Sequence, residues 1–110
     1  MQAEDLEVFH MMPFYFWVKD DQGTYLWANG ALTDAAGEVV VGKTDSELPW
    51  AESAEALRAA DKQVLETGKD LHLKEAAFTF GGEPVTLNLC KFVREFEGAR
   101  CAFGISFILD

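Results

Sequence analysis

The side chains suited to acid–base chemistry are few and far apart. Asp61 lies in a helical pattern, four residues after Leu57 and three before Val64, on the apolar side of that pattern. A carboxylate in such surroundings needs a hydrogen-bond donor, so Asp61 caps a backbone group, pairs with a lysine or senses a ligand. An isomerase-like enzyme needs a second acid or base in the pocket. No histidine or second carboxylate stands beside Asp61 in the sequence, so we do not expect the protein to be an enzyme.

The remaining reactive side chains are isolated from one another. Neither Cys90 nor Cys101 has a second cysteine or a histidine at the short spacing of a metal site or a redox motif, and His10 and His72 stand alone. We therefore expect two reduced thiols packed in strands, no disulfide framework and no protein-bound metal.

Length and composition predict one folded domain. The chain has 110 residues, of which 49% are hydrophobic, 13% aromatic and 25% charged, a balance typical of a globular domain. Its net charge of −10 argues against nucleic acid and anionic membranes as partners. An acidic N-terminus and the lack of any apolar run of roughly 20 residues predict a cytoplasmic protein without membrane contact.

The first part of the chain predicts a helix and a hairpin that must position these side chains. Residues 3–11 form an amphipathic pattern through Leu6 and Phe9. Residues 14–18 are apolar at every position, which indicates a strand buried on both faces. After a charged turn, residues 24–28 return as a second strand.

Helical signals follow the hairpin. Asn29 is suited to cap a helix that Gly37 ends, and Thr44 with Glu47 has the spacing of a capping box. Residues 51–67 form the longest helical pattern in the chain.

The rest of the chain alternates with a period of two. It predicts strands over 71–80, 84–95 and 100–109, joined by glycine turns at 81–82 and 97–98. Two strands, helices and three strands make an α+β domain, in which helices cover one face of a five-stranded antiparallel sheet.

Four stretches occur in an order that belongs to a known family. They are FWVKDDQGTYLWAN, a hairpin with a closing asparagine; GKTDSELPW, a connector; DKQVLETGK, a helix end; and KFVREFEGARCAFGIS, a final hairpin. Together they resemble the PAS domain, the small sensory module of bacterial histidine kinases, cyclases and transcription regulators. The resemblance extends over nearly the whole chain.

The resemblance implies both architecture and function. It implies the strand order 2-1-5-4-3, a cavity between the inner sheet face and the helices, and no catalysis in the domain itself. We expect residues 1–110 to be a single PAS domain, with a flanking helix over 1–12 and a core over 13–110. It would be a fragment of a larger signalling protein whose output domain is, for example, a kinase or a cyclase.

Ligand contacts follow from the alternation of strand 84–95. By similarity to the flavin-binding members, the polar set of this strand faces the cavity with Ser106 from the last strand. Polar groups there need a ligand, water or one another as partners. Aromatic rings suit a planar ligand, although core packing explains them equally well. The predicted ligand-binding residues are Trp17, Trp27, Leu57, Asp61, Thr86, Asn88, Cys90 and Ser106.

The same assignment predicts an apolar outer sheet face. Such a face needs a cover, either the N-terminal helix, the same face of a second chain, or both. We therefore expect a homodimer. The predicted interface residues are Leu6, Phe9, Val85, Leu87, Leu89, Phe103, Ile105 and Phe107.

Two well-known cofactor modes of the family lack their residues here. The haem members ligate iron through a histidine on the long helix, and residues 51–67 contain none. The flavin photoreceptors need a cysteine in the connector, and GKTDSELPW has none. The sequence therefore argues against haem bound in this way and against flavin–cysteine photochemistry. Non-covalent flavin stays open, so the cofactor is unknown.

Two functions remain after the enzyme is set aside. The first is a sensor that binds a small molecule and transmits a signal through dimer contacts. The second is a ligand-free dimerisation module. A cavity with polar side chains favours the first, and a filled core favours the second.

Overall fold

The computed structural model describes residues 1–78 and 82–109, with the side chains of 77, 78 and 109 left aside. The predicted strand over 71–80 and the turn at 81–82 extend into residues 79–81, which lie outside the described residues. In chain order, with η for a 3₁₀ helix, the elements are η1 (Ala3–Met11), β1 (Tyr15–Lys19), β2 (Tyr25–Ala28), α1 (Gly30–Ala36), η2 (Asp45–Glu47), η3 (Ala51–Ser53), α2 (Ala54–Thr67), β3 (Leu71–Phe78), β4 (Pro84–Phe96) and β5 (Ala99–Leu109).

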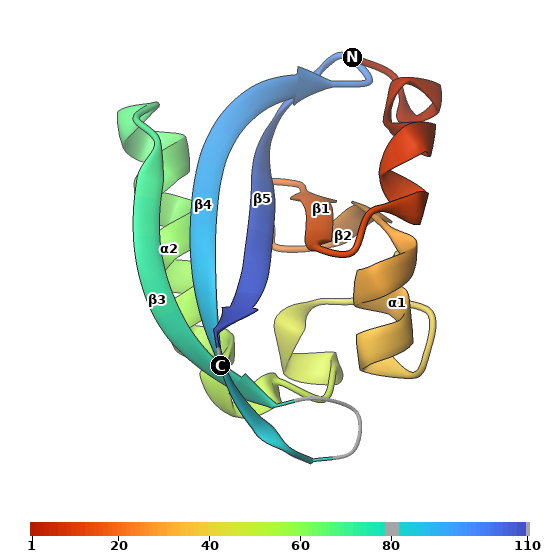
Figure 1. The fold of residues 1–110 in the computed structure, drawn as a ribbon. Coiled ribbons are helices and arrows are strands. Elements are labelled where there is room, and N and C mark those ends of the chain that lie inside the picture. The colour runs from red at the N-terminus through yellow and green to blue at the C-terminus, as the bar shows by residue number, and fades with distance from the viewer. Residues whose placement is uncertain (79–81, 110) are drawn as a thin grey trace.

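The strands form one antiparallel sheet in the order β2-β1-β5-β4-β3. The predicted α+β class and strand order are therefore confirmed. Helix α2 packs against β4 and β5, while η1 lies against α1 at the other end of the sheet (Figure 1). The long strands β3, β4 and β5 curve strongly (Figure 1).

Strand β1 is buried on both faces, as its apolar sequence predicts. The indole of Trp17 packs toward the helices, in a cluster with Leu57 and Trp50. Phe16 and Val18 face the other way, into a second cluster that η1 covers. Each fully buried side chain of this size contributes about 2–3 kcal/mol, so β1 stabilises both layers at once.

Asn29 joins three elements through one fully buried side chain. Its Oδ1 accepts hydrogen bonds from the backbone N–H groups of Phe16 at 3.1 Å and Leu32 at 3.2 Å, the second of which caps α1. Its Nδ2 donates to the carbonyls of Phe9 at 2.9 Å and Phe14 at 2.8 Å. The predicted cap is therefore confirmed, and it also holds the end of η1 against β1.

We expect Asn29→Ala to lower the free energy of unfolding by about 2 kcal/mol, because it removes a cap and leaves buried backbone groups unpaired. Urea unfolding followed by circular dichroism measures this. Thr33→Ala is the control, because its hydroxyl donates a single bond, to the Asn29 carbonyl. A loss no larger than that of the control would contradict the prediction.

Candidate functional site

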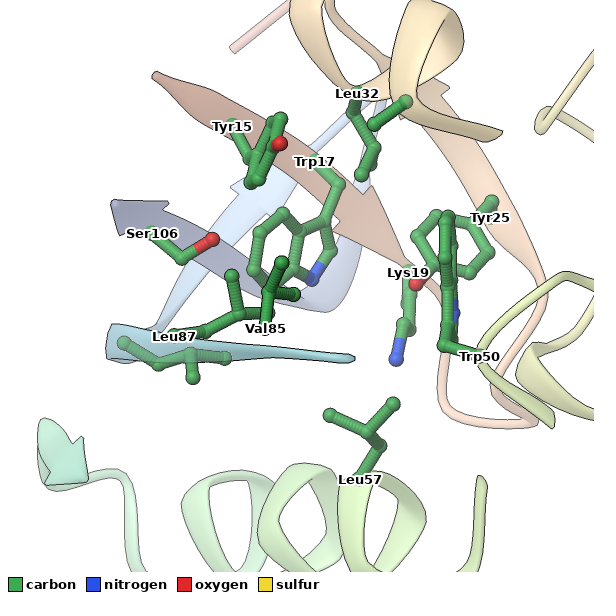
Figure 2. A pocket seen from close by; sticks show the side chains of 12 residues that line it. Tyr15, Trp17, Lys19, Tyr25, Leu32, Trp50, Leu57, Val85, Leu87 and Ser106 are labelled. Atoms are coloured by element: carbon green, nitrogen blue, oxygen red, sulfur yellow. The ribbon is translucent and has the colours of Figure 1, made fainter. Parts of the chain in front are cut away.

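A cavity of about 40 Å³ lies between the inner sheet face and the connecting helices. The indoles of Trp17 and Trp50 and the side chain of Leu57 contribute to its walls, and Lys19 and Ser106 bring polar groups to it (Figure 2). One water needs about 10–15 Å³ of such space, so the cavity holds roughly three waters and has no room for a haem or a flavin. The other lining residues are Tyr15, Tyr25, Leu32, Ala35, Val85, Leu87 and Leu89.

A surface groove of about 510 Å³ adjoins the cavity. The two share Tyr15, Ala35 and Ser106, and the groove continues along Phe14 and Phe107. Cavity and groove together offer room for a ligand that the cavity alone does not hold.

The hydroxyl of Ser106 is the polar group at this junction. Its residue is fully buried, and Oγ has no hydrogen-bond partner among the described residues. The hydroxyl points toward the rings of Tyr15 and Trp17 (Figure 2). A buried hydroxyl without a partner is unfavourable in an apolar site, so a water or another polar group that reached Oγ would be stabilised here.

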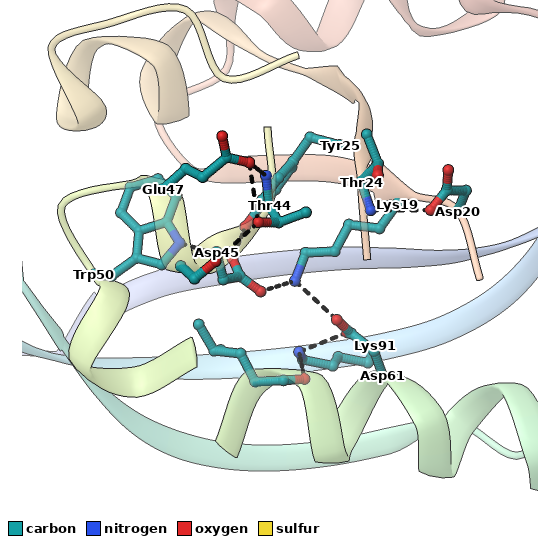
Figure 3. Close-up of polar contacts among 12 residues, drawn as sticks. Lys19, Asp20, Thr24, Tyr25, Thr44, Asp45, Glu47, Trp50, Asp61 and Lys91 are labelled. Atoms are coloured by element: carbon teal, nitrogen blue, oxygen red, sulfur yellow. Dashed lines mark hydrogen bonds and ion pairs between the residues drawn. The ribbon is translucent and has the colours of Figure 1, made fainter. Parts of the chain in front are cut away.

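Asp61 lies at the centre of a buried ion-pair cluster (Figure 3). Its Oδ2 accepts from Lys19 Nζ at 2.8 Å and its Oδ1 accepts from Lys91 Nζ at 2.9 Å. All three side chains are at most 1% exposed. Of the roles that the sequence left open for Asp61, the lysine pair is therefore confirmed, and with two lysines.

Asp45 completes the cluster from the connector. Its Oδ2 accepts from Lys19 Nζ at 2.6 Å, and its Oδ1 accepts from the Tyr25 hydroxyl at 2.6 Å and Trp50 Nε1 at 2.8 Å. The cluster, defined as Lys19, Asp45, Asp61 and Lys91, ties β1 and β4 to η2 and α2. Two lysines and two aspartates balance in charge, which a buried group of ions requires.

The environment of the cluster shifts the pKa values of Asp61 and Tyr25 in opposite directions. Burial alone raises the pKa of Asp61, but the charges and hydrogen bonds of Lys19 and Lys91 outweigh it and hold that pKa below its usual value. Burial, followed by the charge of Asp45, raises the pKa of Tyr25 well above its usual value. Tyr25 is therefore a neutral donor to Asp45 at physiological pH.

Glu75 on β3 is a further carboxylate that interacts electrostatically with the cluster. Burial raises the pKa of Glu75, and the charge of Lys91 offsets only part of this rise. Its Oε2 is buried without a partner among the described residues. The native state therefore binds the Glu75 proton more tightly than the unfolded state does, and stability is lost as pH rises through the native pKa.

We expect Glu75→Gln to stabilise the domain at pH 7, because the amide carries no charge to desolvate. The gain should shrink below about pH 4, where the wild-type carboxyl is protonated as well. Urea unfolding at both pH values measures this, with Glu66→Gln on the exposed side of α2 as the control. A variant that is no more stable than the wild type at pH 7 would contradict the prediction.

The structure brings three of the predicted ligand-binding residues to the cavity, Trp17, Leu57 and Ser106. Asp61 is held behind Lys19 and does not line it. Trp27 lies on the outer face, where its ring is 4.8 Å from that of His10. The polar set of β4 also faces outward, so its predicted placement in the cavity was wrong; this set is Thr86, Asn88 and Cys90.

The pairing register explains this error. Ser106 lies directly opposite Leu89 in the antiparallel pair of β4 and β5, and residues directly opposite each other share a face. An inward Ser106 therefore requires an inward Leu89 and an outward Cys90. A shift of one residue in register exchanges the two faces of a strand.

The predicted interface set changes for the same reason. Val85, Leu87 and Leu89 line the cavity instead of the outer face, so they leave the set. Leu6 and Phe103 are buried within the chain, where η1 covers the outer face. Phe9 stacks on Phe16 with ring centroids 4.7 Å apart. Ile105 is half-buried and Phe107 is 49% exposed.

The cysteines and histidines lie outside the residues that line the cavity. Cys90 Sγ lies 3.8 Å from His72 Nε2 across β3 and β4, and both cysteines are free. Within the described residues, no three metal-ligating side chains gather. No described helix has the length and apolar character to cross a membrane.

Sequence reasoning missed the polar end of the cavity. Lys19 follows an aromatic run and shares the inward face of Trp17, and Lys91 shares the face of Leu89. A lysine on the buried face of a strand needs a carboxylate partner, just as Asp61 needed a donor. Matching these two needs would have predicted the cluster.

Comparison with known structures identifies the fold. The VqmA dimer of Vibrio cholerae is 21% identical, with a TM-score of 0.84, and the match covers 100% of this chain and 53% of VqmA. A structure of VqmA bound to DPO is 22% identical, with a TM-score of 0.84, over 97% of this chain and 57% of that one. This chain thus spans about half the length of the VqmA chains.

A third structure is a single domain of similar size. The PAS domain of an HTR-like protein from Haloarcula marismortui is 18% identical, with a TM-score of 0.78, over 97% of this chain and 91% of that one. None of the curated proteins compared with the chain matches its sequence. The profile of the family described as the PAS fold matches residues 9–107. The chain therefore belongs to the PAS family.

Proposed function

We propose that this PAS domain is a sensory module that binds a small molecule in the cavity and groove and passes the signal to an output domain through dimer contacts. The observation that carries the proposal is the buried hydroxyl of Ser106, which has no partner among the described residues and points into an apolar cavity. A ligand with one hydrogen-bonding group satisfies this hydroxyl and fills the apolar space.

Relatives of the same fold support a small-molecule role. VqmA is a protein of this fold that binds DPO, and we propose that the present domain likewise binds a small molecule. VqmA also forms a complex with DNA. We propose that the present domain itself does not contact nucleic acid, because its net charge is −10. We also propose a cytoplasmic location and an output domain elsewhere in the full protein.

The experiment is native mass spectrometry of the purified domain, with the denatured mass as reference. Extra mass that is lost on denaturation supports the proposal. Ser106→Ala should lower ligand retention and at the same time raise the stability of the ligand-free domain by about 1 kcal/mol, because it removes an unpaired buried hydroxyl. A variant that keeps the ligand and loses stability would show that Ser106 is only structural.

Dimerisation without a ligand is the second candidate. It is favoured by the outer face of β5, where Phe107 is 49% exposed and contacts Phe14 with ring centroids 5.5 Å apart. Phe14 and Ile105 are half-buried beside it, so this end of the outer face keeps exposed apolar area at Phe107. We propose that a second copy of the chain covers it.

Phe107→Asp tests the dimer in analytical ultracentrifugation. We expect it to shift the protein to monomer, whereas Val39→Asp, at a side chain that is 68% exposed in the loop after α1, should not. A dimer that survives Phe107→Asp, together with a mass spectrum without ligand, would remove both proposals.

A further inference from the structure

We infer that the cavity selects an uncharged ligand and excludes both anions and cations, because of how the buried cluster presents its charges. This inference rests on the proposed function and names the class of molecule that the site takes. Neither the fold nor the family match specifies the charge of a ligand.

The side of the cluster that meets the cavity is the cationic one. Lys19 lines the cavity, together with Tyr25 and Trp50, which donate to Asp45. Neither Asp45 nor Asp61 is among the lining residues. A cationic ligand would therefore lie closer to the Lys19 side chain than to either carboxylate, and the carboxylate oxygens are already engaged.

Binding of an anionic ligand is disfavoured as well. The Lys19 ammonium already holds Asp45 at 2.6 Å and Asp61 at 2.8 Å. An anion bound to the same nitrogen would lie close to both carboxylates, whose repulsion offsets the attraction to Lys19. The charge of Glu75, which interacts with Lys91 and Asp61, adds to this repulsion. The rest of the wall offers only neutral groups, which compensate poorly for the lost hydration of an ion.

A neutral ligand meets no such penalty. The unpaired hydroxyl of Ser106 provides both a donor and an acceptor. An alcohol, amide or neutral heterocycle can therefore bind it, while the remainder of the molecule replaces water against Trp17 and Leu57. The cluster stays intact in this complex, because no ion competes for its members.

Three compact probes of one shape test the inference: isobutanol, isobutyrate and isobutylamine. They are titrated into the ¹⁵N-labelled domain at neutral pH, and the three tryptophan indole N–H signals are followed. Trp17 and Trp50 line the cavity, whereas Trp27 lies on the outer face, so Trp27 is an internal control. We expect isobutanol to shift the Trp17 and Trp50 signals saturably and to bind at least about tenfold more tightly than either ion.

The possible outcomes distinguish a failure of this inference from a failure of the proposed function. If isobutyrate or isobutylamine binds the cavity as tightly as isobutanol, the inference is wrong and ligand binding stands. If a co-purified ligand proves to be an ion, the result is the same. If no probe shifts Trp17 or Trp50 and no ligand co-purifies, the proposed sensor function fails together with the inference.

Two charge variants extend the test. Asp45→Asn keeps an oxygen for Tyr25 and Trp50 but leaves the cluster with one excess positive charge. It should improve isobutyrate binding at least about tenfold relative to isobutylamine. Asp61→Asn should act in the same direction. Ser106→Ala, as the control, should weaken isobutanol without changing the order of the two ions. Unchanged ion selectivity in a folded Asp45→Asn protein would overturn the inference.

Discussion

Gly104→Ala is expected to lower the free energy of unfolding by about 3 kcal/mol and to abolish binding in the cavity. Gly104 lies opposite Trp17 in the pairing of β1 with β5, and the indole lies across its Cα. A Cβ at this position would be 2.2 Å from Trp17 Cε2 and 2.3 Å from Cζ2. The indole must therefore move into the cavity that it borders. Urea unfolding measures the loss of stability, and the Trp17 indole signal reports the displacement.

A double variant shows whether this clash is the cause. In a Trp17→Leu background the ring atoms are gone, so the added Cβ should lower stability by less than about 1 kcal/mol. Equal losses in the two backgrounds would mean that Gly104 acts through something other than the indole.

Asp61→Asn is expected to lower the free energy of unfolding by about 4 kcal/mol. The change leaves Lys19 and Lys91 buried with one carboxylate between them, and breaking a buried ion pair typically costs about 3–5 kcal/mol. Chemical unfolding at pH 7 measures the effect. Glu66→Gln on the exposed side of α2 is the matched control, with an expected change within about 0.5 kcal/mol.

A second substitution separates charge from shape. Adding Lys91→Met to Asp61→Asn restores the charge balance, so the double variant should be more stable than Asp61→Asn alone. A double variant that is less stable than the single one would show that the cluster acts through packing and hydrogen bonds alone.

The loss should also depend on pH in a defined direction. The native pKa of Asp61 is lowered, so its contribution to stability is fully present above about pH 4, the ordinary value for an aspartate. It disappears as pH falls through the lower native value. The difference between wild type and Asp61→Asn should therefore shrink in acid, and a constant difference down to pH 2 would contradict the assignment.

The order of elements could be predicted because local signals specify it. The helix caps at Asn29 and Gly68 depend on residues within a few positions of each other, and the structure shows Gly68 at φ 69°, where α2 ends. The apolar run of β1 indicates burial on both faces without any knowledge of its neighbours. Strand order, in contrast, came only from the family resemblance.

The cavity could be predicted less well because it depends on long-range register. The sequence shows two alternating sets in β4, but nothing local states which set Ser106 joins, since that depends on the pairing with Leu89. Lys19 and Asp61 are 42 positions apart. Their ion pair becomes evident only when β1 and α2 are packed together, although each residue alone signals a missing partner.

Ser106 and Phe107 are neighbours on β5 that point to opposite faces of the sheet. The first borders the cavity, and the second lines the adjoining groove and belongs to the proposed interface between copies. Ligand and partner would thus act on the same stretch of strand. Thermodynamic linkage then imposes reciprocity: if the ligand tightens the dimer by a given factor, the dimer must tighten the ligand by that factor. Ligand affinity measured at micromolar and millimolar protein would reveal this coupling without any knowledge of the output domain.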